Sequence, residues 1–151
     1  MLTLEHLNER VDNLFSAARQ DMLKVGTVPE TVVLLNGGGT GLVIANLTAL
    51  PLRAAPERMA GQIRKHRAVA AAHLCQFTAV ALAHPALAGG GTQIPQHLRH
   101  LLMSMGYWPA RGYCRVRAAQ VVQHSDMVDL VELDEPSTPL THWLAELLPR
   151  H

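Results

Sequence analysis

The chain has 151 residues, of which 48% are hydrophobic and 17% are charged. This balance excludes an intrinsically disordered chain and fits one ordinary globular domain. The formal net charge at pH 7 is +1, so the total charge by itself indicates no particular class of partner.

Targeting and redox features predict a cytoplasmic protein. Residues Met1–Glu5 lack the basic and apolar regions of a secretory signal. The most apolar stretch, Ala68–Ala83, is too short for a bilayer span of about 20 residues, so we expect no membrane partner. Two cysteines, Cys75 and Cys114, do not make a disulfide framework. Arginine outnumbers lysine eleven to two, and with the many alanines this indicates a GC-rich bacterial genome.

Charge is distributed unevenly along the chain. Between Glu57 and Asp126 there is no acidic residue, whereas this interval holds many arginines and histidines. The segment that follows is acidic and contains one basic side chain other than histidine, Arg150. A basic middle and an acidic end predict either an anionic partner or pairing between the two parts of the chain.

The N-terminal third predicts a helix followed by a hairpin. Thr3 can cap a helix whose apolar positions are spaced alternately by three and four residues, and Gly26 and Pro29 end it. The runs 31–35 and 42–47 read as strands, and Asn36-Gly37 between them is a strong hairpin signal. The apolar positions of the predicted first helix are Leu4, Leu7, Val11, Leu14, Ala18 and Met22.

The middle of the chain is less regular. Pro56 fits the first turn of a second helix that reaches about His66. Residues 68–80 fit either a strand or a continuation of that helix, and their Val, Cys, Phe and Thr content favours the strand. Residues 84–95 contain Gly89–Gly91 and predict a flexible connection. A third helix is expected from Ile94 or Pro95 to Met105, with Leu98, Leu101, Leu102 and Met105 as its apolar positions.

The last third predicts a second hairpin and a final helix. Strands 113–122 and 127–133 would be joined by a turn at His124-Ser125, which sets Arg117 opposite Glu132 and Arg115 opposite Asp134. The final helix follows Pro136 and Pro139, is capped by Ser137 or Thr138, and has Leu140, Trp143, Leu144 and Leu147 as its apolar positions. The order α-ββ-α-β-α-ββ-α predicts a single α+β domain over residues 1–151, with a largely antiparallel five-stranded sheet and helices on one or both faces.

Motifs of catalysis and cofactor binding are absent from the sequence. The Gly37–Gly41 turn lacks the Gly-Lys-Ser/Thr of a phosphate-binding loop. His97 and His100 could share a helix face, but two ligands do not make a zinc site. His124-Ser125-Asp126 has the residue types of a hydrolase triad, yet triad members converge from separate segments. We therefore predict no catalytic residue, no cofactor and no metal ligand.

Two basic segments are the best candidates for a partner-binding surface. In residues 107–117, alternation along a strand would set arginines and an aromatic ring on one face. A second cluster follows the second helix, where the helix dipole also favours cations. Arginine suits bidentate contacts with carboxylates and phosphates. The candidate residues are Trp108, Arg111, Tyr113, Arg115, Arg117, Arg64, Lys65 and Arg67.

Three functions follow from these features. The first is a non-catalytic interaction module with a basic-aromatic surface for an acidic or anionic partner; we expect it to self-associate, and the first helix could pack on its own sheet or on a second subunit. The second is a single-stranded nucleic-acid-binding protein that uses residues 107–117. The third is a small enzyme, which requires His73, Cys75, His97, His100 or His124 to converge in a cleft.

Overall fold

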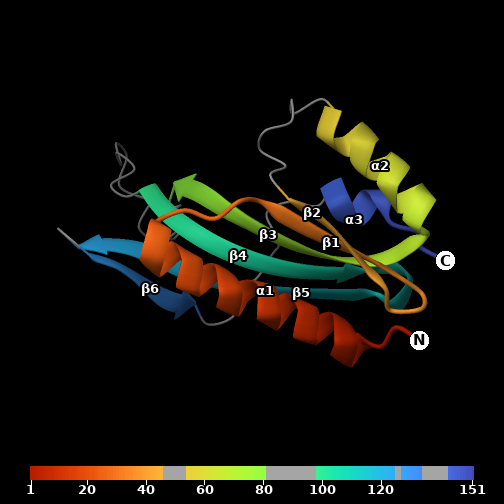
Figure 1. The fold of residues 1–151 in the computed structure, drawn as a ribbon, viewed down its shortest axis with the longest axis horizontal. Coiled ribbons are helices and arrows are strands. Elements are labelled where there is room, and N and C mark those ends of the chain that lie inside the picture. The colour runs from red at the N-terminus through yellow and green to blue at the C-terminus, as the bar shows by residue number, and fades with distance from the viewer. Residues whose placement is uncertain (46–53, 81–97, 125–126, 134–142) are drawn as a thin grey trace, which may run out of the picture.

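The computed structural model describes residues 1–45, 54–80, 98–124, 127–133 and 143–151. They form a six-stranded antiparallel sheet in the order β2-β1-β3-β4-β5-β6, with helices on both faces (Figure 1). Helix α1 (Leu4–Val25) crosses one face, while α2 (Ala54–His66) and the short α3 (Trp143–Leu147) lie on the other. The α+β class and the antiparallel sheet are therefore confirmed, but the sheet has six strands rather than five.

The strands alternate their side chains between two apolar cores. They are β1 (Thr31–Asn36), β2 (Gly41–Ala45), β3 (Ala68–Val80), β4 (Leu98–Trp108), β5 (Tyr113–His124) and β6 (Met127–Leu133). In β1, Val32 and Leu34 join the core under α2 and α3, whereas Val33 and Leu35 join the core under α1. Strand β3 confirms the strand interpretation of residues 68–80.

Helix α1 has the cap that the sequence predicts and most of the predicted buried face, but Leu4 is 37% exposed and Phe15, which is outside the predicted stripe, is fully buried. The Thr3 hydroxyl accepts a hydrogen bond from the backbone N–H of His6 at 3.1 Å, and Gly26 ends the helix with φ +82°. Leu7 and Val11 are fully buried against the sheet of their own chain. The apolar side of the first helix therefore packs on the sheet of its own chain. No helix in the described part of the chain is long and apolar enough to cross a membrane.

The helix expected from Ile94 or Pro95 to Met105 is wrong: residues 98–108 form β4, a central strand. Its residues 102–108 are buried without alternation, because α1 covers one side and α3 the other. A strand buried on both faces loses the period-two pattern, so an apolar run with three-and-four spacing imitates a helix. Gly106 allows α1 to approach, since a Cβ there would lie 2.7 Å from Cγ2 of Val11.

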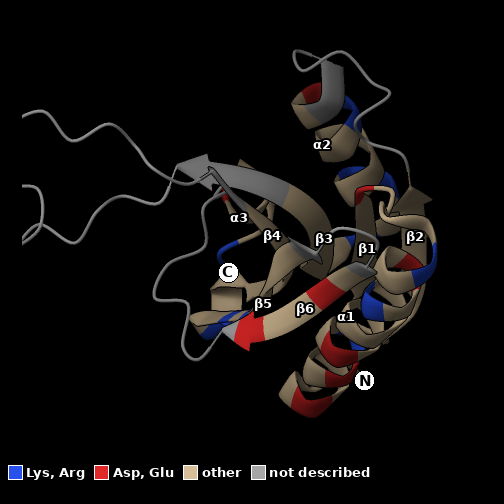
Figure 2. Cartoon of the chain, turned by 90° about the vertical axis from the view of Figure 1, so that its left-hand side faces the viewer, with Lys and Arg blue, Asp and Glu red and all other residues tan. Residues whose placement is uncertain are grey.

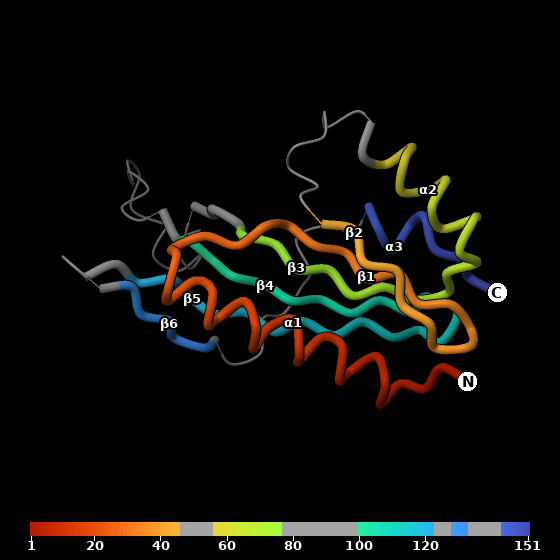
Figure 3. The backbone as a smooth tube through the Cα atoms, viewed as in Figure 1, coloured from red at the N-terminus to blue at the C-terminus, as the bar shows by residue number. Residues whose placement is uncertain are grey.

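The second hairpin exists, but its register differs by two residues from the prediction. Ala119 pairs with Glu132, and His124 pairs with Met127 in the neighbouring strands β5 and β6 (Figure 3), so His124 is a paired strand residue and not part of the turn as predicted. A shift of two keeps every side chain on its predicted face. Arg117 therefore still reaches Glu132, as a diagonal neighbour instead of an opposite one. The expected partner Asp134, the Gly-rich connection 84–95 and the start of the last helix lie outside the described residues.

Candidate functional site

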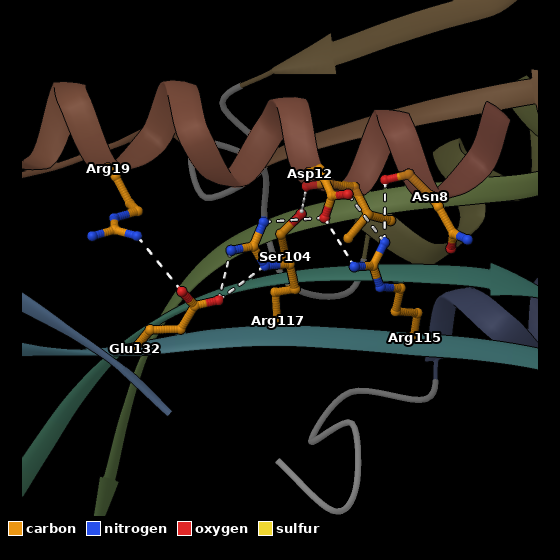
Figure 4. A network of polar contacts seen from close by, with 8 residues as sticks. Asn8, Asp12, Arg19, Ser104, Arg115, Arg117 and Glu132 are labelled. Atoms are coloured by element: carbon orange, nitrogen blue, oxygen red, sulfur yellow. Dashed lines mark hydrogen bonds and ion pairs between the residues drawn. The ribbon is translucent and has the colours of Figure 1, made fainter. Parts of the chain in front are cut away.

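Two of the predicted binding arginines, Arg115 and Arg117 on β5, point at α1 and are paired there (Figure 4). Asp12 of α1 lies between them, with its Oδ1 atom 3.1 Å from Nη2 of Arg115 and 3.1 Å from Nη1 of Arg117. Glu132 of β6 accepts from Nη2 of Arg117 at 2.6 Å, and Arg19 approaches its other oxygen at 3.7 Å.

This network stabilises the charged arginines within the fold. Burial alone would lower the pKa of Arg117, but its hydrogen bonds to Glu132 and Asp12 outweigh that effect and raise the pKa. The guanidinium also lies over the ring of Phe15, 4.4 Å from its centroid. Internal pairing of the basic middle is therefore present. Asp12, the acid that both arginines contact, comes from the N-terminal helix, and its pairing was not predicted. In the sequence, Asp12 directly follows Val11 of the apolar stripe, and this position beside the buried face was the available signal.

Two aromatic residues of segment 107–117, Trp108 and Tyr113, cover one end of the α1-side core, whereas Tyr107 is buried in the core under α2 and α3. Trp108 is 8% exposed and joins that core together with Tyr113. The exposed Arg111, in the 3₁₀ turn η3 (Pro109–Arg111), lies over the Trp108 ring with 5.2 Å between the guanidinium carbon and the ring centroid. Burial raises the pKa of Tyr113. Little ring surface at Trp108 is therefore left for a stacked base.

The other predicted cations lie at the corner where α2 passes into β3, a position occupied by Arg64, Lys65 and Arg67. All three side chains are exposed, and within the described ranges no carboxylate lies at ion-pair distance from them. Figure 2 shows the basic bands on α2 apart from the acidic residues of α1 and β6. We call these three residues the α2–β3 corner.

A hollow of about 380 Å³ opens at this corner. Arg64 and Arg67 contribute its charged lining, while Leu147 at the end of α3 and Pro149 after it contribute apolar lining. The remaining lining is apolar and comes from Ile63, Ala68 and Val69. Two cations therefore face an apolar hollow, which is the combination that binds an anionic group carried on an apolar body.

Arg67 has an unusual backbone conformation for its residue type. With φ +57°, it is the one non-glycine residue of positive φ in the part of the chain that the structure describes. It follows the last residue of α2, and its N–H donates to the carbonyl of Arg64 at 3.2 Å. Glycine usually occupies such a left-handed position after a helix, since a side chain there costs roughly 1–2 kcal/mol. The arginine side chain is thus retained at an unfavourable backbone position.

A second hollow, of about 370 Å³, also borders the C-terminal segment. It is lined by Pro109 of η3 and by Ala145, Glu146 and Arg150. Because η3 contacts β3, this hollow and the α2–β3 corner belong to the same end of the sheet. Here an acid and a base are both present, so the lining favours neither anions nor cations.

Among the described candidates, His73 and Cys75 lie on the same face of β3 but lack the features of a nucleophilic pair. His73 is 1% exposed, and its Nε2 lies 2.7 Å from Oε1 of Glu30. Cys75 follows two residues later on the same strand face, and burial, together with the Glu30 charge, raises the pKa of its thiol to about 12. Such a thiol is protonated at neutral pH and is a poor nucleophile.

Within the described segments, the other histidines add no ligand set. By strand register, His100 lies on the α1 face of β4, opposite to the face of His73. The side chains of His97 and His124 lie outside the described residues. Across the described segments, no three His, Cys, Asp or Glu side chains gather so that they could hold a metal ion. Both Cys75 and Cys114 are free thiols.

Comparison with known proteins adds no relative: no family model, no curated protein and no solved structure matches this chain. The geometry of the chain itself therefore carries the functional argument.

Proposed function

We propose that this protein is a non-catalytic binding module whose α2–β3 corner receives an acidic group of a partner protein. One observation carries the proposal: Arg64 and Arg67 line a hollow and have no carboxylate partner among the described residues, although Arg115 and Arg117 of the same acid-free stretch are paired.

The backbone at Arg67 supports the same site. A left-handed residue with a side chain is less stable than glycine at that place, and such strain is found preferentially at binding and catalytic sites. The guanidinium groups can bind a carboxylate in a bidentate manner. The apolar lining from Ile63, Leu147 and Pro149 suits a peptide in which an acidic residue neighbours an aliphatic one.

The two other functions receive less support from the contacts. Single-strand binding through residues 107–117 needs free arginines and open rings, whereas Arg115 and Arg117 are paired and Trp108 is largely covered. A cysteine enzyme needs a thiolate in reach of a base, whereas the pKa of Cys75 is raised.

Fluorescence anisotropy with a short rhodamine-labelled peptide that alternates Glu and Leu tests the proposal. The double variant Arg64→Ala/Arg67→Ala should bind at least about tenfold more weakly than the original chain, equivalent to roughly 1.4 kcal/mol. Arg58→Ala/Lys24→Ala is the matched control, because it removes the same charge from exposed helical positions away from the hollow. Equal losses in both double variants would show unspecific electrostatic attraction and contradict a site at the corner.

A single-stranded oligonucleotide serves as the second probe in the same assay. We expect weaker binding than to the peptide at physiological salt, with no dependence on Arg115→Ala or Arg117→Ala. Tight oligonucleotide binding that those two substitutions abolish would instead favour the nucleic-acid function.

A further inference from the structure

The two edges of the sheet differ in how well they are protected against pairing with another strand. β6, at one edge, carries Asp129 and Glu132, and its Leu130 N–H donates to the Asp129 carboxylate at 2.8 Å. Glu132 is also held by Arg19 and Arg117. Charges and occupied backbone donors are the usual means by which an edge strand avoids intermolecular pairing.

β2, at the opposite edge, has none of these devices. Its sequence, Gly41-Leu42-Val43-Ile44-Ala45, contains no charge and no proline, and its pairing with β1 is continuous without a bulge. Val43 is 61% exposed. Leu42 and Ile44 pack at the margin of the core under α2 and are only partly buried. An uncharged edge strand without proline or bulge is a template for strand addition.

We propose that β2 pairs with β2 of a second copy of this chain, antiparallel across a two-fold axis at Val43. In that register, Val43 faces its own copy, Leu42 faces Ile44, and Gly41 faces Ala45. Large side chains meet large ones and small meet small, so the strand is complementary to itself. The two sheets become continuous, and the partly buried Leu42 and Ile44 gain cover from the partner.

The contrast between the edges also determines the size of the assembly. Pairing β2 of one copy with β6 of another would repeat without end and build a filament. The charges of β6 oppose that arrangement, whereas pairing of β2 with β2 uses the unprotected edge of both copies and closes at a dimer. α1 packs mainly over β3 to β6. Its Arg10 comes near the start of β2, where a Cβ at Gly41 would lie 3.5 Å from Nη2 of Arg10, whereas Val43 at the proposed axis is 61% exposed.

This surface is separate from the α2–β3 corner, so the dimer does not depend on the proposed anion binding. It supplies an interface for the self-association that the sequence predicts, in place of the first helix, whose apolar side is already buried. A five-residue edge strand buries less area than a standard interface of about 1,600 Å². We therefore expect a dimer that dissociates on dilution.

Sedimentation velocity over a concentration series tests this dimer. The original chain should shift from monomer to dimer as concentration rises, and Val43→Lys should remain monomeric at every concentration. Val131→Lys is the matched control, because Val131 is an exposed valine on the other edge strand, 52% exposed, and it should dimerise like the original chain. A strictly monomeric original chain, or a loss of dimer in Val131→Lys alone, would overturn the proposal.

A cross-linking experiment keeps the test decisive if Val43→Lys is poorly folded. In a Cys114→Ser background, Val43→Cys places one accessible thiol on the proposed axis, since Cys75 is buried. Residues directly opposite in an antiparallel pair have Cβ atoms about 4.5–5.5 Å apart, so mild oxidation should yield a disulfide-linked dimer on a non-reducing gel. Val131→Cys in the same background should not; equal cross-linking at both positions means random collision and refutes the two-fold pairing.

Discussion

The arginines of β5 and those of the α2–β3 corner come from one acid-free stretch of sequence, yet only those of β5 have carboxylate partners among the described residues. Arg115 and Arg117 lie under α1, where Asp12 and Glu132 reach them from distant parts of the chain. Arg64 and Arg67 end beside an apolar hollow with no described carboxylate near them. A run of basic sequence is therefore weak evidence for a binding surface until the positions of the acids are known.

The largest expected effect comes from removing the shared acid of the paired group. Asp12→Ala leaves both Arg115 and Arg117 without one of their partners, and we expect the free energy of unfolding to fall by about 2 kcal/mol. Urea unfolding measures this. Asp21→Ala is the control, because Asp21 is an exposed carboxylate of the same helix and has no ion pair among the described contacts; a similar loss there would argue against a specific network.

The ion-pair network and the buried Cys75 thiol should contribute differently to stability at alkaline pH. The pKa of Arg117 is raised, so its pairing persists at high pH. The folded pKa of Cys75 is about 12, whereas an unfolded thiol ionises near about pH 8.5. The unfolded chain therefore releases this proton first, and the stabilisation is complete below about pH 8.5 and is lost as pH rises toward 12.

The expected slope is about 1.4 kcal/mol per pH unit for this one proton. Urea unfolding in a pH series should show it in the original chain and show a shallower fall in Cys75→Ala. An unchanged slope in that variant would mean that other groups, such as Tyr113, dominate the alkaline loss.

At the corner, we expect stability and binding to change in opposite directions. Arg67→Gly removes the side chain from a left-handed backbone position, and we expect a gain of about 0.5–1 kcal/mol in the free energy of unfolding. The same variant should bind the Glu-Leu peptide more weakly. Arg67→Ala should lose binding without the gain in stability, because alanine keeps the strained Cβ; a destabilised Arg67→Gly would contradict the strain argument.

The smallest expected effect on stability belongs to Arg64. Because its side chain is exposed and has no carboxylate partner in the described ranges, Arg64→Ala should change the free energy of unfolding by less than about 0.5 kcal/mol. Thermal or urea unfolding beside Arg117→Ala completes the comparison. An Arg64→Ala variant as unstable as Arg117→Ala would show that the corner cations have a structural role.

Local patterns predicted those parts of the fold that depend on nearby residues. The Thr3 cap, most of the α1 stripe and the hairpin after Asn36 were correct, because each depends on contacts within a few positions; Phe15 was missed from the stripe, and Leu4 is exposed. β4 was missed, since burial on both faces erases the strand period. The hairpin register was off by two, a shift that apolar matching tolerates because it preserves the faces.

The site was harder to predict than the fold. The sequence indicated Arg64, Arg67, Arg115 and Arg117 but not Arg19, which also approaches Glu132, and it could not divide these arginines into paired and unpaired ones. That division depends on α1 crossing β5, a long-range contact that places Asp12 between Arg115 and Arg117. The hollow depends on the C-terminal segment returning to the end of α2, for which no local pattern exists.

The close approach of α1 to β4 at Gly106 affects the ion pairs of Asp12 as well as the packing. Its bare Cα lets Val11 touch β4, and the neighbouring Ser104 hydroxyl donates to the Val11 carbonyl at 2.8 Å. Asp12 is the next residue, so the height of α1 above this glycine determines whether its carboxylate reaches the two arginines. A methyl group at Gly106 would press on Val11, and a shift of α1 away from β4 would lengthen the contacts of Asp12 with Arg115 and Arg117. Arg117 would keep Glu132, which reaches it from β6, whereas Arg115 would lose its carboxylate. The absence of a side chain at Gly106 therefore keeps the charge of Arg115 paired within the fold.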